Sequence, residues 1–290
     1  MEFHQECLQC GSPELGAMHG YESSHLCRCK ACGLVFAQAI PTLEELEAYY
    51  DGYGRDDYLS PLTVKRYHEL LDQFESYRST GRILDVGCGI GYFLEVAKER
   101  GWEVFGTEFT DRAVEICEEK GIEMHKGVLD PADYQPESFD IITSFEVLEH
   151  INTPVVELTK FYHLLRKGGL VYLTTPNFNS LIRRILGPKY DVICYPEHLT
   201  YFTPSTIDFA FRKSGFTKSR LQTTGFSVSR LRAKKGEEMQ EYISPDSDDE
   251  KLRRSLEGSR WLRVVKELVN SLLTLFGSGD TLKCWYVKGG

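Results

Sequence analysis

The sequence has 290 residues, of which 41% are hydrophobic and 27% are charged, and its formal net charge at pH 7 is −9. This composition is typical of globular proteins, and the acidic balance argues against a general nucleic-acid-binding protein. No apolar run approaches the roughly 20 residues of a membrane-spanning helix, and the first residues lack the basic and apolar regions of a signal peptide. We therefore expect a cytoplasmic protein whose nine cysteines stay reduced.

Five of the nine cysteines lie between residues 7 and 32. Cys7 with Cys10, and Cys29 with Cys32, form two C-x-x-C-G motifs with 18 residues between them (11 to 28). This spacing lies within the roughly 15–20 residues typical of four-cysteine zinc sites, in which closed sulfur ligation is structural. We predict that the four cysteines hold one zinc ion in residues 1–40, which resemble a zinc ribbon. Reduced free thiols are the alternative, and Cys27 is a rival ligand.

Residues 41–80 are predicted to form a helical cap segment ahead of the main domain. Thr42 is suited to cap a short helix over 43–50, and a second helix over 61–77 carries apolar residues at helical spacing. Between the two helices lies a loop rich in turn residues and tyrosine.

Residues 83–91 predict a buried strand that carries Asp85 and continues into a glycine-rich turn and a helix. Glycine permits a sharp turn and a close approach of the backbone to a ligand. The next strand ends in Glu108, 17 residues after Gly91 (108 − 91), where an acid can bind ribose hydroxyls. The turn reads G-x-G-x-G, not the G-x-G-x-x-G of dinucleotide sites, so it suits a ligand with an ammonium group and no phosphate. Its three glycines are Gly87, Gly89 and Gly91.

This stretch resembles the first motif of class I S-adenosylmethionine-dependent methyltransferases. The resemblance implies that Asp85 orients the methionine moiety of the cofactor, that the three glycines line it, and that Glu108 binds the ribose. An NAD-linked oxidoreductase is disfavoured by the glycine spacing.

Apolar strands alternate with helices from residue 82 onward, which predicts a doubly wound, mostly parallel α/β sheet. The resemblance implies a Rossmann-like domain over 81–290 with seven strands, the last of them antiparallel. It also places Leu129 in the adenine-binding loop. The expected strands cover 82–86, 103–107, 122–125, 139–144, 169–175, 216–223 and 281–288, and the expected helices cover 91–100, 110–120, 153–166 and 203–214.

A second motif runs from Phe139 to His150 and is similar to the family pattern F-D-x-I…E-V-L-E-H. The resemblance implies that Phe145 packs against the cofactor. Glu146, Glu149 and His150 are at i, i+3 and i+4, so we expect them to share one helical face. Ubiquinone-pathway O-methyltransferases have a similar Glu-x-x-Glu-His, associated with a divalent metal and a phenolic substrate. The alternative is that Glu149 and His150 form hydrogen bonds within the fold.

Residues 178–203 are expected to recognise the substrate. Tyr195-Pro-Glu197-His198-Leu-Thr-Tyr201-Phe202 resembles a stretch of sugar C-methyltransferases, which also carry N-terminal cysteine motifs. Pro196 replaces a histidine of that pattern, so only a catalytic role for His198 is carried over, with Glu197 as a helper. A histidine is suited to take a proton from an attacking hydroxyl. The alternative is that Glu197 and His198 only start the following helix.

Residues 231–279 form an insert outside the resemblance, charged and polar over 232–256. Residues 261–276 have apolar side chains at helical spacing. We interpret them as a packed or dimerising helix rather than a membrane surface anchor, and therefore expect a homo-oligomer.

The sequence thus predicts a methyltransferase that uses S-adenosylmethionine, with a structural zinc ribbon in front. We expect O-methylation of a saccharide or another small molecule, with C-methylation of a sugar nucleotide as the second choice. The ribbon with Arg183 and Arg184 could instead dock RNA, although the acidic charge counts against nucleic acid. A cofactor-binding scaffold without catalysis is the remaining alternative.

Overall fold

The computed structural model of the chain describes residues 2–42, 44–46, 59–227 and 259–289, together with residues 230, 251 and 255. Most of the predicted helix over 43–50, and nearly all of the insert before residue 259, lie outside these described residues. In the described part of the chain, no helix combines the length and the apolarity needed to cross a membrane.

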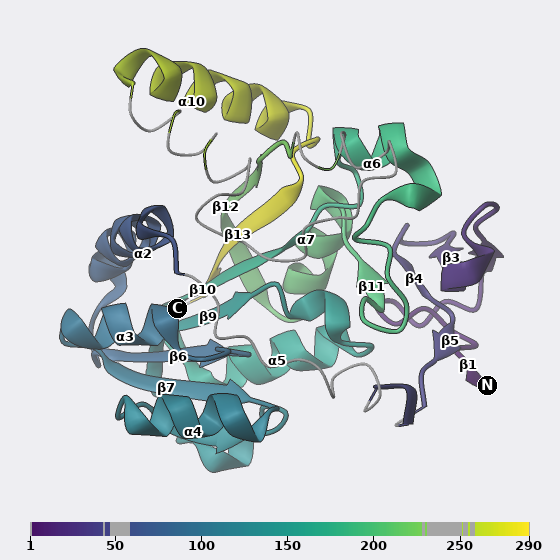
Figure 1. The fold of residues 1–290 in the computed structure, drawn as a ribbon. Coiled ribbons are helices and arrows are strands. Elements are labelled where there is room, and N and C mark those ends of the chain that lie inside the picture. The colour runs from purple at the N-terminus through teal and green to yellow at the C-terminus, as the bar shows by residue number, and fades with distance from the viewer. Residues whose placement is uncertain are drawn as a thin grey trace.

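A seven-stranded sheet forms the centre of the molecule, in the order β12-β13-β10-β9-β6-β7-β8 (Figure 1). β13 pairs antiparallel with both β10 and β12, and the other pairs are parallel. This topology confirms the doubly wound, mostly parallel fold with an antiparallel last strand. The strands are β6 (Arg82–Val86), β7 (Glu103–Glu108), β8 (Glu123–Lys126), β9 (Phe139–Phe145), β10 (Leu165–Pro176), β12 (Phe216–Thr224) and β13 (Thr281–Lys288).

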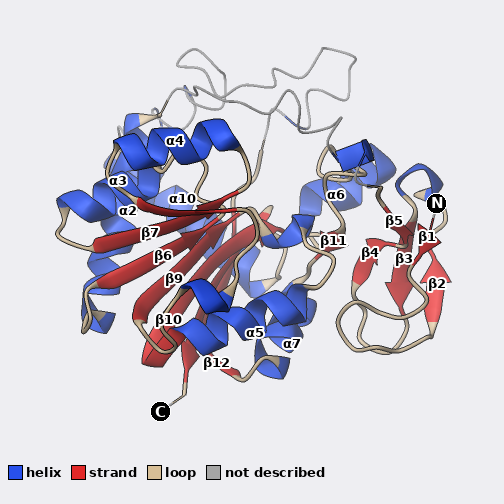
Figure 2. Cartoon of the chain, turned by 90° about the horizontal axis from the view of Figure 1, so that it is seen from below, coloured by secondary structure: helices blue, strands red, loops and turns tan. Residues whose placement is uncertain are grey.

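Successive residues of each central strand enter two different hydrophobic cores, because side chains alternate across a sheet. In β6, Ile83 packs with helices α2 and α3, whereas Leu84 packs on the other face with α5 and α7. Figure 2 shows these helices on the two sides of the sheet. The helices are α2 (Pro61–Phe74), α3 (Tyr92–Glu99), α4 (Asp111–Glu119), α5 (Pro154–Leu164), α6 (Leu181–Leu186), α7 (Pro204–Lys213) and α10 (Arg260–Leu275).

The N-terminal unit is a small antiparallel sheet joined to the main domain by a strand from the far end of the chain. β2 (Leu15–Ala17), β3 (Leu26–Cys29) and β4 (Val35–Ala37) are completed by β11 (Thr200–Tyr201), which pairs with β4. Beside them, β1 (Glu2–Phe3) pairs with β5 (Ala39–Ile40). Cys29, Leu34 and Phe36 also belong to the same hydrophobic core as α5 and α7. The ribbon is therefore packed onto the large domain.

Short 3₁₀ turns complete the described elements. They are η1 (Glu22–Ser24), η2 (Glu75–Tyr77), η3 (Pro131–Asp133), η4 (Leu148–His150) and η5 (Gly187–Lys189).

One boundary differs from the prediction. The helix expected over 153–166 ends at Leu164, and the strand expected over 169–175 begins at Leu165. The Nζ of Lys288 in β13 donates to the carbonyls of Tyr162 and Leu165, which satisfies the carbonyl groups at the helix end. That lysine lies more than a hundred residues away in the sequence, so the local pattern gave no sign of it.

Candidate active site

The carboxyl ends of β6 and β7 bring the first predicted set of ligand-binding residues together. Glu108, at the end of β7, accepts hydrogen bonds through its carboxylate from the backbone N–H groups of Gly89, Phe109 and Thr110. The acid predicted to bind ribose therefore lies directly beside the glycine turn. Ligands of open parallel sheets bind at this edge.

Asp85 is a buried carboxylate without an ion-pair partner among the described residues, being only 2% exposed. Its Oδ1 accepts a hydrogen bond of 2.7 Å from the hydroxyl of Thr143 on β9. Burial raises the pKa of Asp85 to about 7, although the hydrogen bond from Thr143 partly offsets this effect. A cationic ligand group would supply the missing opposite charge. The sequence identified Asp85 but could not identify Thr143, which comes from a separate strand.

The glycine turn has open space at its centre and tight packing at its first position. A Cβ atom placed on Gly89 meets no atom within 4 Å, whereas one on Gly87 would lie 2.5 Å from a methyl group of Val147. Gly89 has a φ of 54°, a value that side-chain-bearing residues adopt with strain. Gly87 is thus required by the fold, and Gly89 leaves space for a ligand against the backbone.

The other two predicted cofactor residues are placed differently from each other. Phe145 ends β9 and is half-buried in an aromatic cluster, with its ring centre 5.1 Å from that of Phe93 and 5.7 Å from that of Tyr172. Leu129 is only 2% exposed and packs in the main core, while its neighbour Val128 is 75% exposed. Contact with a ligand in this loop therefore falls to the backbone or to Val128, not to the Leu129 side chain.

The expectation that Glu146, Glu149 and His150 share a helical face is wrong. Glu146 has a φ of 54° and precedes the short 3₁₀ turn η4, so it is not part of a helix. Glu149 is buried, and its Oε2 accepts a hydrogen bond of 2.9 Å from the hydroxyl of Thr175. Burial, followed by the charge of Glu146, raises the pKa of Glu149 well above its ordinary value.

The structure instead brings His198 to Glu149 and His150. The potential ligand atoms of these three side chains all lie within 4.8 Å of one another, and the two imidazole rings meet edge to face at 4.8 Å. Backbone contacts hold the segment of His198 in place, because Leu199 N–H donates to the carbonyl of Glu149 and Thr200 Oγ1 donates to that of Leu148. No sequence spacing could reveal this arrangement across 48 residues (198 − 150).

Both histidines have one ring nitrogen fixed by the backbone. His150 Nδ1 lies 2.9 Å from the carbonyl of Glu197, and His198 Nδ1 lies 2.6 Å from that of Val192. A carbonyl only accepts, so each Nδ1 carries the proton and each neutral ring keeps a lone pair on Nε2. Burial lowers the pKa of both histidines, which favours these neutral forms. Glu197 supplies its backbone carbonyl to this arrangement, while its carboxylate is not among the three grouped side chains.

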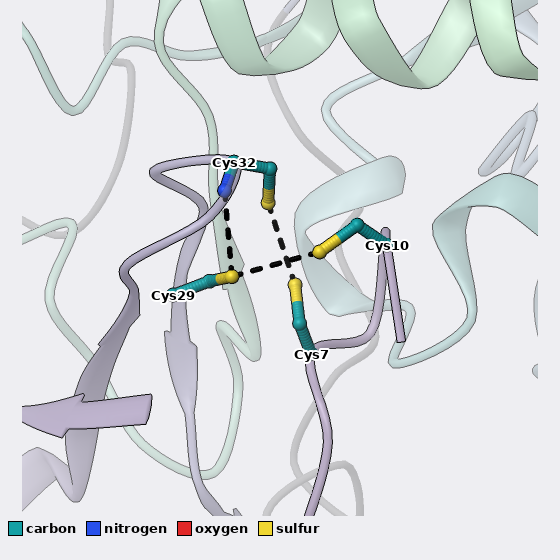
Figure 3. A group of neighbouring side chains, drawn as sticks. All are labelled: Cys7, Cys10, Cys29 and Cys32. Carbon is teal, nitrogen blue, oxygen red and sulfur yellow. Dashed lines mark hydrogen bonds between the residues drawn. The ribbon is translucent and has the colours of Figure 1, made fainter. Parts of the chain in front are cut away.

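The four predicted zinc ligands converge at one point of the N-terminal unit (Figure 3). Cys7 Sγ lies 3.5 Å from Cys32 Sγ, and Cys10 Sγ lies 3.6 Å from Cys29 Sγ. Zinc–sulfur bonds of about 2.3 Å in a tetrahedron require sulfur–sulfur distances of roughly 3.8 Å. The donor set and its spacing therefore fit zinc. Cys27 is buried in the neighbouring core and is not part of this group.

The arginines considered for RNA docking have partners within the protein. Arg183 donates from Nε to the carbonyl of Phe178, with its guanidinium 4.4 Å from the ring centre of the same residue. Arg184 donates to the side-chain oxygen of Asn179. Both arginines thus contribute to the local structure of α6.

Comparisons with known proteins agree with this geometry. A family model described as a methyltransferase domain matches residues 58–221. The chain is 28% identical over 162 residues to a ubiquinone biosynthesis O-methyltransferase of Nitrosomonas europaea, covering 51% of this chain and 69% of that protein. It is 31% identical over 139 residues to the protein so named from Idiomarina loihiensis, covering 43% of this chain and 57% of the relative. The chain thus spans only part of the length of these relatives.

The solved structures show the same fold. A SAM-dependent methyltransferase from Archaeoglobus fulgidus superimposes with a TM-score of 0.53 at 20% sequence identity, covering 84% of this chain and 98% of that one. This likeness concerns the fold alone, since the identity is low.

Proposed function

The chain belongs to the methyltransferase family, and on this premise we propose that it transfers a methyl group from S-adenosylmethionine to a hydroxyl oxygen of a small molecule. The residues that would hold the cofactor are Asp85, the backbone around Gly89, and Glu108. The unpaired Asp85 carboxylate suits the ammonium group of the methionine moiety, and Glu108 suits the ribose hydroxyls. When bound, S-adenosylmethionine supplies an electrophilic methyl group on a sulfonium.

The pair of buried neutral imidazoles is the observation that carries the choice of an oxygen acceptor. His198 is the base in this proposal, since its Nε2 lone pair can take the hydroxyl proton as the acceptor oxygen attacks the methyl carbon. His150 lies beside it and would share the resulting positive charge with the carboxyl group of Glu149. The rest of catalysis is alignment, because in-line displacement needs the oxygen held opposite the leaving sulfur.

The same three side chains also match a divalent metal site, as a second candidate arrangement. One carboxylate and two imidazoles, each imidazole oriented through a backbone carbonyl, are a donor set that transition metals accept. A cation held there would polarise the acceptor oxygen. Metal analysis separates the two arrangements: a second metal per chain that disappears in His198→Gln favours the cation, and a single metal retained in that variant favours the base.

Two classes of acceptor are to be compared. The stretch around His198 resembles that of sugar enzymes, which supports a saccharide, whereas the relatives named above are ubiquinone biosynthesis O-methyltransferases, which supports a phenol. Methyl transfer from isotope-labelled S-adenosylmethionine to saccharides and to catechols tests both, and transfer to carbon or RNA would contradict the proposed oxygen chemistry.

Gly89→Ala is expected to weaken the binding of S-adenosylmethionine at least tenfold while the protein stays folded. The added methyl group would occupy the open space against the turn, and its strain at positive φ costs only about 1 kcal/mol. Isothermal calorimetry with S-adenosylmethionine and S-adenosylhomocysteine measures the affinity, and thermal melting measures the fold. Gly87→Ala is the contrasting variant, because it should lower the melting temperature through its clash with Val147. Unchanged affinity in Gly89→Ala would contradict the proposed cofactor site.

The proposed base predicts the pH dependence of kcat. Burial lowers the pKa of His198 below its model value of 6.5, so the base remains neutral at lower pH than an exposed histidine. At saturating cofactor, kcat should hold as pH falls through 6.5 and decline only as pH passes the lowered pKa. Calorimetry over the same pH range separates this effect from the titration of Asp85. A decline centred above pH 6.5 would contradict the assignment.

A further inference from the structure

Helix α10 turns its apolar side to solvent. Its polar side contacts the sheet: Asn270 Oδ1 accepts from the backbone N–H of Gly225, and Thr274 Oγ1 donates to the carbonyl of Thr223. Most surface helices bury their apolar side instead. We call the outward side the α10 apolar face; its residues, each between 44% and 75% exposed, are Trp261, Val264, Leu268, Val269, Leu272, Leu275 and Phe276.

The size of the α10 apolar face indicates an interaction surface. Aromatic side chains present about 150–250 Å² each, so the seven exposed side chains together offer roughly 800 Å². The largest apolar patch of a typical monomer is about 300–600 Å². Figure 1 shows α10 at the outer edge of the molecule, beyond β12 and β13. The face contains no charged residue, and it is accessible along the full helix.

A basic hollow lies next to this face, between α10 and α2. It has a volume of about 230 Å³, and four of its charged lining residues are basic and two acidic. This local excess of positive charge contrasts with the net charge of −9 of the whole chain. The four basic residues are Lys65, Arg66, Arg263 and Lys266, and the two acidic residues are Glu69 and Glu267.

We propose that α10 docks on a membrane surface that carries anionic headgroups. The apolar face would enter the boundary between headgroups and acyl chains, with the helix parallel to the membrane, and the basic hollow would face the headgroup phosphates. A helix of 16 residues is about 24 Å long and suits this position. Two copies paired through α10 would instead place two positive hollows beside one another, whereas anionic headgroups complement them. This inference replaces the expectation of a dimerising helix, and it does not depend on the methyl-transfer reaction.

Trp261 provides a direct test, because it is 71% exposed while Trp102 and Trp285 are buried. The full-length protein is mixed with vesicles of phosphatidylcholine alone or with added phosphatidylglycerol. We expect a blue shift of tryptophan emission with the anionic vesicles, and quenching by lipids brominated on their acyl chains. Sedimentation with the vesicles gives the affinity. Absence of both the shift and the sedimentation would overturn the proposal.

Variants on the helix complete the test. Leu268→Glu, at an exposed position, should weaken vesicle binding by roughly tenfold or more, since burial of one leucine is lost and a charge is added. Arg263→Glu combined with Lys266→Glu should weaken binding to phosphatidylglycerol by a similar factor. Val156→Glu, which alters an equally exposed valine on α5, is the matched control and should bind as the wild type does. Light scattering without vesicles measures the mass. A dimer that Leu268→Glu dissociates would assign the face to a second copy and overturn membrane docking.

Discussion

His198→Gln is expected to lower kcat for methyl transfer by about 10²–10⁴-fold, the range for loss of a general base. Glutamine has similar bulk and can donate to the carbonyl of Val192, so the segment should keep its position. It cannot take a proton. Affinity for S-adenosylmethionine should stay within a few-fold of wild type, because Asp85 and Gly89 lie on a different strand and turn.

Steady-state kinetics with an identified acceptor, together with calorimetry of the cofactor, measure both quantities. His163→Gln is the matched control: it makes the same substitution on α5 at an exposed histidine outside the site. An unchanged kcat in His198→Gln would refute the base and move the non-catalytic scaffold forward. A lowered kcat with lost cofactor affinity would show that His198 acts through the fold.

Local patterns were sufficient to predict the parts of the site that lie on single turns. The glycine turn after β6, the acid that ends β7 and the cysteine pairs are each encoded within a few residues. Strand positions were also predictable, because a strand buried on both faces reads as a continuous apolar run. The fold and the location of Asp85 and Glu108 followed from these signals.

Contacts between distant segments could not be predicted. The grouping of His150 with His198 depends on Leu199 and Thr200 bonding to the backbone around Glu149. The left-handed backbone of Glu146 places it outside the expected helical face, and only glycine would have signalled such a conformation. The amphipathic pattern of α10 was visible in the sequence, but the pattern does not say which side meets the sheet.

The zinc ribbon is connected to the catalytic segment through these distant contacts. β11 follows His198 by two residues and pairs with β4, and the N–H of Ala37 donates to the carbonyl of Leu199. Phe178, Leu199 and Tyr201 form one hydrophobic cluster with ribbon residues such as Val35. The ribbon therefore holds one side of the segment that carries His198, and the η4 turn holds the other.

Cys29→Ser is consequently expected to remove zinc and to impair methyl transfer together. Structural zinc contributes about 10–16 kcal/mol in zinc-finger peptides, so the loss of a ligand should unfold the ribbon. kcat should fall with it, because β11 loses its partner strand, while the cofactor residues on β6 and β7 retain their places. Elemental analysis should give one zinc per chain at the ribbon in the wild type and none there in the variant.

Cys27→Ser separates loss of the metal from damage to the core. Cys27 is buried in the same unit but is not grouped with the four sulfurs, so this variant should keep zinc and lose only about 1–3 kcal/mol for the buried hydroxyl. Zinc lost from Cys27→Ser and kept by Cys29→Ser would mean that the ligand set is wrong. If Cys29→Ser loses zinc but keeps its kcat, the ribbon does not position His198, and the contacts of β11 serve stability alone.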